Sequence, residues 1–155
     1  MDPNQAAALI QTGGVAALAF AAVGSALGSG AAGASAVGAW KKCYVQKKPA
    51  PFLLAAFVGA PLSQTIYGFV LMLVMNFKVN EIMQAVQAQA GNGTPIPLDI
   101  TQLVARWPFF LVGGFVAGIA MGASAWMQGR AGAGASDAFA ETGEGFTNNL
   151  TVLGI

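Results

Sequence analysis

Residues 7–40 read AALIQTGGVAALAFAAVGSALGSGAAGASAVGAW and contain no charged side chain. Two more charge-free runs follow, at residues 49–77 and residues 107–129. A helix needs about 20 apolar residues to cross the hydrocarbon core of a bilayer, so each run is long enough for one crossing. The pattern predicts an all-α membrane protein.

The composition of the whole chain points the same way. Its 155 residues are 55% hydrophobic and only 8% charged, whereas a soluble domain carries about 25% charged residues. Seven Lys and Arg against six Asp and Glu give a net charge of +1, which offers no electrostatic basis for binding nucleic acid. The chain has no histidine and the single cysteine Cys43, which argues against a histidine-based catalytic site, a disulfide framework and a Cys-rich zinc site. These features exclude an ordinary water-soluble enzyme.

The basic residues predict the orientation in the membrane. Residues 41–48 form a short turn that carries four lysines, Lys41, Lys42, Lys47 and Lys48. By the positive-inside rule this turn is cytoplasmic and the N-terminus lies outside. Residues 78–106 are then an external connection, and their segment GNGTPIP at residues 91–97 is typical of a turn. The acidic start of the chain lacks the basic flank of a cleaved signal peptide.

A tandem repeat of helical hairpins is expected. A shift of 99 residues aligns Ser25 with Ser124 and Gly30 with Gly129, so residues 1–77 and 107–155 are predicted to be the first and second hairpins. The same topology in both halves differs from that of an inverted transporter repeat. The last apolar segment, from Leu150 to Ile155, is too short to span a membrane. We therefore expect a four-transmembrane-helix protein whose fourth helix is truncated in this sequence.

Small residues recur at helical spacing in the first and third charge-free runs. Gly24 and Gly28 are four residues apart, as are Gly118 and Gly122. Small residues at this spacing let helix backbones approach closely in lipid. Because small residues run almost without a break through residues 24–39, we expect helices crowded on several sides, as in an oligomer, in preference to an isolated helix pair.

Polar side chains at membrane depth are the candidate functional residues. Ser63, Gln64 and Tyr67 lie in the middle of the second run, and Gln128 lies near the end of the third. Their neutral oxygens suit an alkali cation or a hydrogen bond to a carboxylate. Interhelical hydrogen bonds worth about 1 kcal/mol each are the simpler interpretation. No Asp or Glu in the three runs balances the charge of a cation.

Three segments of the chain resemble a known family. They are PLSQTIYGF from Pro61, QGRA from Gln128 and EGFTNNL from Glu144. The chain resembles the proteolipid, the K or c-type subunit of the rotor ring, of a bacterial V-type or A/V-type rotary ATPase with four helices per subunit. The likeness covers nearly the whole chain except residues 78–106, which look longer than usual.

The resemblance implies an ion site and its ligands. In sodium-carrying members the ion lies among residues of helices two, three and four. Carried over to this sequence, the metal ligands are Ser63 in the place of a threonine, Gln64, Tyr67, Gln128, and the carbonyl of Ala60 in the place of a leucine. The glutamate of helix four would follow Ile155 within a few residues. The transported ion is Na⁺, or H⁺ in the same pocket, and no covalent cofactor is implied.

The resemblance also implies a setting. The chain would be a non-catalytic, multi-pass subunit of a bacterial inner membrane, in a homo-oligomeric ring surrounded by the lipid bilayer. A static membrane subunit with half-channels and central-stalk subunits on the cytoplasmic side would be its partners. Two other functions remain open: a small oligomeric membrane transporter, and a structural proteolipid with no ion-carrying carboxylate.

Overall fold

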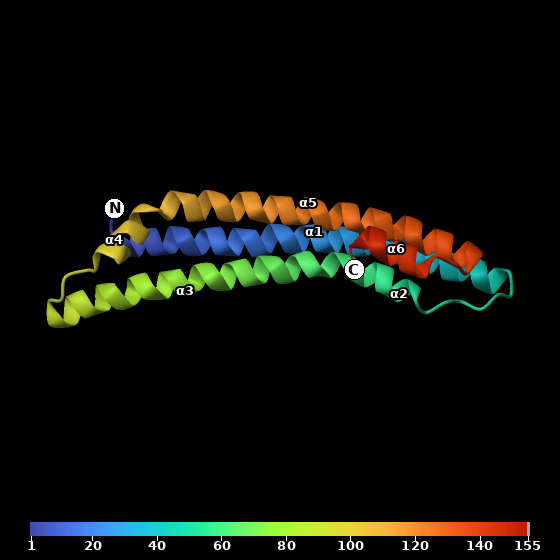
Figure 1. The fold of residues 1–155 in the computed structure, drawn as a ribbon, viewed down its shortest axis with the longest axis horizontal. Helices are drawn as coiled ribbons and strands as arrows, with labels where there is room; N and C mark the ends of the chain where they lie inside the picture. Colours follow the sequence, from blue (N-terminus) through green and yellow to red (C-terminus); the bar gives the residue numbers. More distant parts are fainter. Residues whose placement is uncertain (155) are drawn as a thin grey trace. The chain divides into compact units, whose positions relative to one another are not determined.

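The computed structural model describes residues 1–154, which contain no strand and are almost entirely helical, with 87% of the chain in helix. The elements in order are α1 (Pro3–Val45), α2 (Leu54–Gly59), the 3₁₀ turn η1 (Ala60–Leu62), α3 (Ser63–Asn92), α4 (Leu98–Ala105), α5 (Trp107–Thr142) and α6 (Phe146–Leu153) (Figure 1).

Three helices are long and apolar enough to cross a membrane. They comprise α1 with 43 residues, the continuous path Leu54–Asn92 with 39 residues, and α5 with 36 residues. Large apolar side chains such as Val23, Leu27 and Phe69 are exposed on them. A helix that is apolar on its outward face as well fits a membrane span. The three predicted spans are confirmed as helices, and they are consistent with an integral membrane protein. A fourth spanning helix stays a prediction, since α6 has eight residues.

The path through the second span bends at a proline. Pro61 has no backbone N–H, so it cannot continue the hydrogen-bond ladder of α2. The structure places it in η1, and α3 begins directly after this turn. The interruption lies next to the candidate polar residues Ser63 and Gln64.

The connection at residues 78–106 is more helical than the turn residues suggest. α3 continues through Asn92, and only residues 93–97 separate it from α4. The reason lies in the apolar positions Val79, Ile82 and Val86, which recur every three or four residues and pack against a core. Gly93 (φ 67°) then ends the helix in a left-handed conformation.

The chain divides into two compact units, and the division cuts across α1, the α3 span and α5. The first unit contains residues 1–20 and 66–120. Here the N-terminal part of α1 contacts α5 through Gly13 and α3 through Gly14. The buried core of this unit consists of Ala7, Ile10, Met75, Val79, Ile82 and Ile100.

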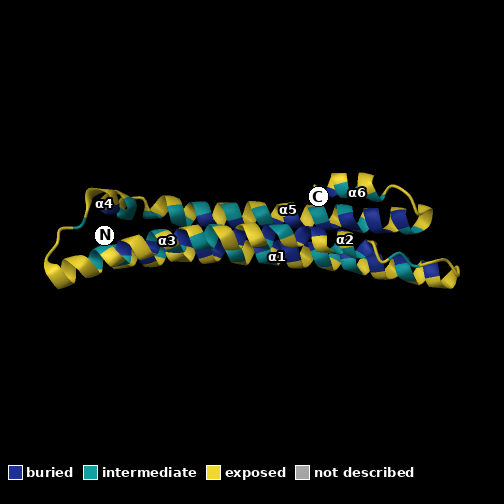
Figure 2. Cartoon of the chain, turned by 60° about the horizontal axis from the view of Figure 1, so that its bottom comes forward, coloured by how far each residue is buried: buried dark blue, intermediate teal, exposed yellow. Residues whose placement is uncertain are grey.

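The second unit contains residues 21–65 and the chain from Met121 onward. Its core includes three aromatic rings, Phe57, Phe139 and Phe146, with centroids 5.3–6.3 Å apart. Through Phe146 and Leu153, α6 packs against this core. Figure 2 shows α6 with its exposed residues outward, beside the C-terminal part of α5. The two predicted hairpins remain a prediction from the sequence.

Candidate functional site

The second unit holds a close approach of α1, η1 and α5. A Cβ atom on Gly28 would overlap the backbone of Ala125 and lie 3.0 Å from the Cβ of Pro61. A Cβ atom on Gly129 would overlap the backbone of Gly28. Glycine at Gly28 therefore lets the helix break at Pro61 and the stretch of α5 that carries Gln128 contact the same turn of α1.

Two serines of α1 lie at this approach, and one of them stabilises it. The Ser25 hydroxyl donates a hydrogen bond of 2.6 Å to the carbonyl oxygen of Pro61, and the serine is 1% exposed. Ser29, one turn further, has a buried hydroxyl oxygen with no hydrogen-bond partner in residues 1–154. Because residues four apart lie on one face of a helix, both serines belong to the same side of α1.

The residues after the break place three oxygens together. The Ser63 hydroxyl lies 3.1 Å from the carbonyl oxygen of Ala60 and 2.9 Å from Oε1 of Gln64. A serine hydroxyl has one proton, so it can donate to only one of the two acceptors at a time. Gln64 is only 9% exposed. The Ala60 carbonyl also accepts the backbone N–H of Ser63, so both acceptors have a donor when the hydroxyl points to Gln64. The cluster brings together a carbonyl, a hydroxyl and an amide oxygen, which are groups able to bind a cation.

Gln128 is held by α6. Its side-chain Nε2 donates a hydrogen bond to the carbonyl oxygen of Leu153, while its Oε1 is buried without a partner among the described residues. Leu153 is 3% exposed and belongs to the same apolar cluster as Ala60. The hydrogen bond from Nε2 thus orients the amide of Gln128, and its Oε1 atom remains available to another donor or to a cation.

Tyr67 differs from these residues in its exposure. It follows Gln64 by three positions on α3, is 61% exposed and falls in the first unit. Ala60, Ser63 and Gln64 are in direct contact, and Gln128 lies in the same unit as these three. Whether the five predicted ligands hold an ion together stays a prediction.

Two groups of polar atoms near the candidate site were not predicted from the sequence. Ser25 and Ser29 are the first, and the Leu153 carbonyl that orients Gln128 is the second. The signal for the serines was present, because two hydroxyl residues at a spacing of four interrupt an apolar helix. No pattern in a sequence identifies the partner of a backbone carbonyl.

The candidate site is electrically neutral. Among residues 1–154, no group of three or more His, Cys, Asp and Glu side chains is placed to hold a metal ion. The six acidic residues, at positions 2, 81, 99, 137, 141 and 144, all lie outside the three charge-free runs. The arrangement can supply neutral oxygens to an ion or to a carboxyl group, and it cannot balance a full charge by itself.

Comparison with known proteins gives no relative: no family model matches the chain, and no curated protein or solved structure matches it either.

Proposed function

We propose that this chain is a rotor-ring proteolipid subunit of a V-type ATPase or ATP synthase, which carries Na⁺, or H⁺, across the membrane. The observation that supports this proposal is a buried amide oxygen in the second unit that has no hydrogen-bond partner in the described chain. It is the Oε1 atom of Gln128, and Ser63 and Gln64 of the same unit bring two further oxygens together. A buried amide oxygen without a partner costs about 1–3 kcal/mol, and binding a cation or a carboxyl proton removes that cost.

The proposed mechanism also needs a carboxylate at this level of the membrane. The resemblance to rotor proteolipids assigns that role to a glutamate in a fourth helix. A carboxylate in low dielectric is strongly penalised when charged and unpaired, so it holds either a proton or a cation. Rotation of the ring carries each loaded site past the static subunit, which exchanges the ion. Across 100 mV each charge is worth about 2.3 kcal/mol.

The surface of the chain suits a ring of identical subunits. Gly30, Ala34 and Gly38 form an exposed face of small residues on α1, and no atom lies within 4 Å of a Cβ built on Gly30 or Gly38. Helices pack closely in lipid through such faces. In the proposed ring, α1 of the next subunit occupies this face.

The test compares glutamine variants in the complete ATPase complex. Gln64→Leu and Gln128→Leu remove the amide oxygens, and Gln87→Leu, an exposed residue of α3, is the matched control. We measure ATP-driven uptake of ²²Na⁺ and of H⁺ into membrane vesicles at several ion concentrations. Losing one ligand should weaken binding of the carried ion about tenfold, since each 1.4 kcal/mol is a factor of ten.

Either of two results would contradict the proposal. One is that neither ion is taken up by vesicles in which the wild-type chain is incorporated, as expected for a structural proteolipid. The other is that the control and the two site variants bind the ion equally well. A complex that carries a drug-like cation instead would favour the small transporter.

A further inference from the structure

A cavity of about 260 Å³ lies in the first unit, against α3, α4 and the start of α5. Four charged residues line it: Lys78 and Glu81 from α3, Asp99 from α4, and Arg106 directly after α4. Apolar side chains, among them that of Phe110, form part of the wall. The volume lies just below the range of about 300–1,000 Å³ for small-molecule sites, so it suits a small polar group.

The charges of the cavity point to a zwitterion. Lys78 donates to both carboxylate oxygens of Glu81, at 2.8 and 2.9 Å. Neither Arg106 nor Asp99 makes a salt bridge within residues 1–154. Two bases and two carboxylates leave the cavity with no net charge. A simple anion gains little from such a site, whereas a ligand with both charges can meet Arg106 with its anion and Asp99 with its cation.

The position of the cavity along the chain points to a lipid. Lys78 directly follows the second charge-free run, and Arg106 directly precedes the third, so the cavity lies where both runs leave the hydrocarbon. Trp107 directly follows Arg106, and Trp is enriched at the interface between lipid and water. Two exposed rings, Phe77 and Phe109, add apolar surface near the ends of the two runs.

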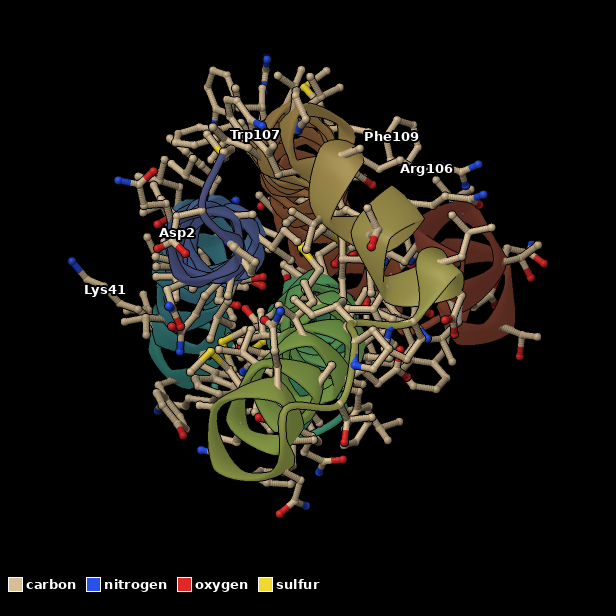
Figure 3. The ribbon with its side chains drawn as sticks, turned by 90° about the vertical axis from the view of Figure 1, so that its left-hand side faces the viewer. Asp2, Lys41, Arg106, Trp107 and Phe109 are labelled. Atoms are coloured by element: carbon tan, nitrogen blue, oxygen red, sulfur yellow. The ribbon has the colours of Figure 1, made fainter. Side chains whose placement is uncertain are left out.

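Figure 3 shows how the labelled side chains lie around Arg106. Arg106 and Phe109 project to the same side of the junction between α4 and α5, and Trp107 projects to the other side. A headgroup bound at Arg106 would therefore have an exposed aromatic ring beside it for its acyl chains. Free phosphate or a soluble zwitterion would make no use of that ring.

We propose that this cavity binds the headgroup of an aminophospholipid, with the phosphate at Arg106 and the primary ammonium at Asp99. Lys78 keeps one N–H donor for the phosphate, since its ammonium group has three. The inference does not rest on the proposed ion transport. It assigns to α4 the role of holding a lipid at the end of the bundle.

The first experiment measures which lipid stays with the protein. The full chain, stripped of lipid in detergent, is offered phosphatidylethanolamine, phosphatidylcholine or phosphatidylglycerol, and bound lipid is counted by native mass spectrometry. We expect phosphatidylethanolamine to bind at least tenfold more tightly than the other two. Phosphatidylcholine lacks N–H donors for Asp99, and phosphatidylglycerol lacks the cation. Equal retention of all three lipids would overturn the proposal.

The second experiment locates the site. Arg106→Gln should weaken phosphatidylethanolamine binding about tenfold, because it removes a charge-assisted contact with phosphate. Arg106→Lys should restore part of the binding. Asp99→Asn should weaken phosphatidylethanolamine and leave phosphatidylglycerol unchanged. Lys41→Gln and Glu144→Gln are the matched controls, since both residues are exposed and lie in the second unit.

A third experiment tests whether the site recognises a whole lipid or only the chemical groups of its headgroup. Inorganic phosphate and phosphoethanolamine are added as competitors at millimolar concentration. The proposal expects weak competition by phosphoethanolamine and none by phosphate. If phosphate alone displaces the lipid completely, the site is an anion site and the proposal is wrong. Circular dichroism of each variant should show unchanged helix, because Arg106 and Asp99 are exposed.

Discussion

Glycine at Gly28 and Gly129 is required by contact between backbones. A Cβ on either residue would overlap the backbone of the opposite helix. Gly134, five residues further along α5, has no atom within 4 Å of its Cβ position. Alanine substitutions at Gly129 and Gly134 therefore distinguish the effect of helix packing on stability from the effect of helix propensity.

We expect Gly129→Ala to destabilise the protein and Gly134→Ala to stabilise it slightly. Overpacking costs about 1–3 kcal/mol, whereas alanine gains up to about 1 kcal/mol over glycine in a helix interior. Thermal unfolding of the detergent-solubilised chain, followed by circular dichroism, measures both. A Gly129→Ala variant as stable as the Gly134→Ala variant would show that α1 and α5 do not approach at Gly28.

At the same scale, one contact among the predicted ligands is seen and the site as a whole stays a prediction. Ser63 and Gln64 were predicted as ligands of one site, and their side chains hydrogen-bond to each other. Tyr67 was predicted for the same site and is largely exposed. Helical spacing gives the direction of a side chain, whereas the neighbours of that side chain depend on tertiary packing that no spacing records.

The helices of the fold could be predicted in the three segments of the sequence that contain no charged residue. Each charge-free run became a long helix, because an apolar segment of that length satisfies its backbone groups internally. The break at Pro61 was predictable from the missing N–H. By contrast, α4 and the last part of α3 were not predicted. Gly and Pro led us to predict a turn at residues 91–97, whereas the structure has only residues 93–97 between the two helices.

The connections between the helices allow a test of orientation. With Cys43→Ser as background, Thr94→Cys adds a thiol in the connection between α3 and α4, and Gln46→Cys adds one after α1; both positions are exposed. The positive-inside rule predicts that a membrane-impermeant maleimide labels position 94 from outside intact cells. Position 46 should react only after the membrane is opened.

An unmodified Cys43 in otherwise wild-type protein is the control, because this residue is buried. If both introduced thiols react from the same side, the span Leu54–Asn92 does not cross the membrane. The topology assigned to the helices would then be wrong.

At the scale of the whole molecule, three long apolar helices carry the neutral oxygens of the proposed ion site. The described chain supplies amide, hydroxyl and carbonyl groups around the break at Pro61. In the proposed function, a carboxylate in a fourth helix supplies the negative charge that a bound cation needs. Such a carboxyl group reacts with hydrophobic carbodiimides when it is protonated, and a bound cation protects it.

The most direct measurement is therefore carbodiimide modification of the full-length protein in its native membrane, analysed by intact mass and by peptide sequencing. The proposed ion transport predicts one modified carboxyl group per chain, in the proposed fourth helix. For a sodium carrier, added Na⁺ slows the reaction; for a proton carrier, alkaline pH slows it. Absence of any modified carboxyl group within a membrane-spanning helix would contradict the proposed ion transport.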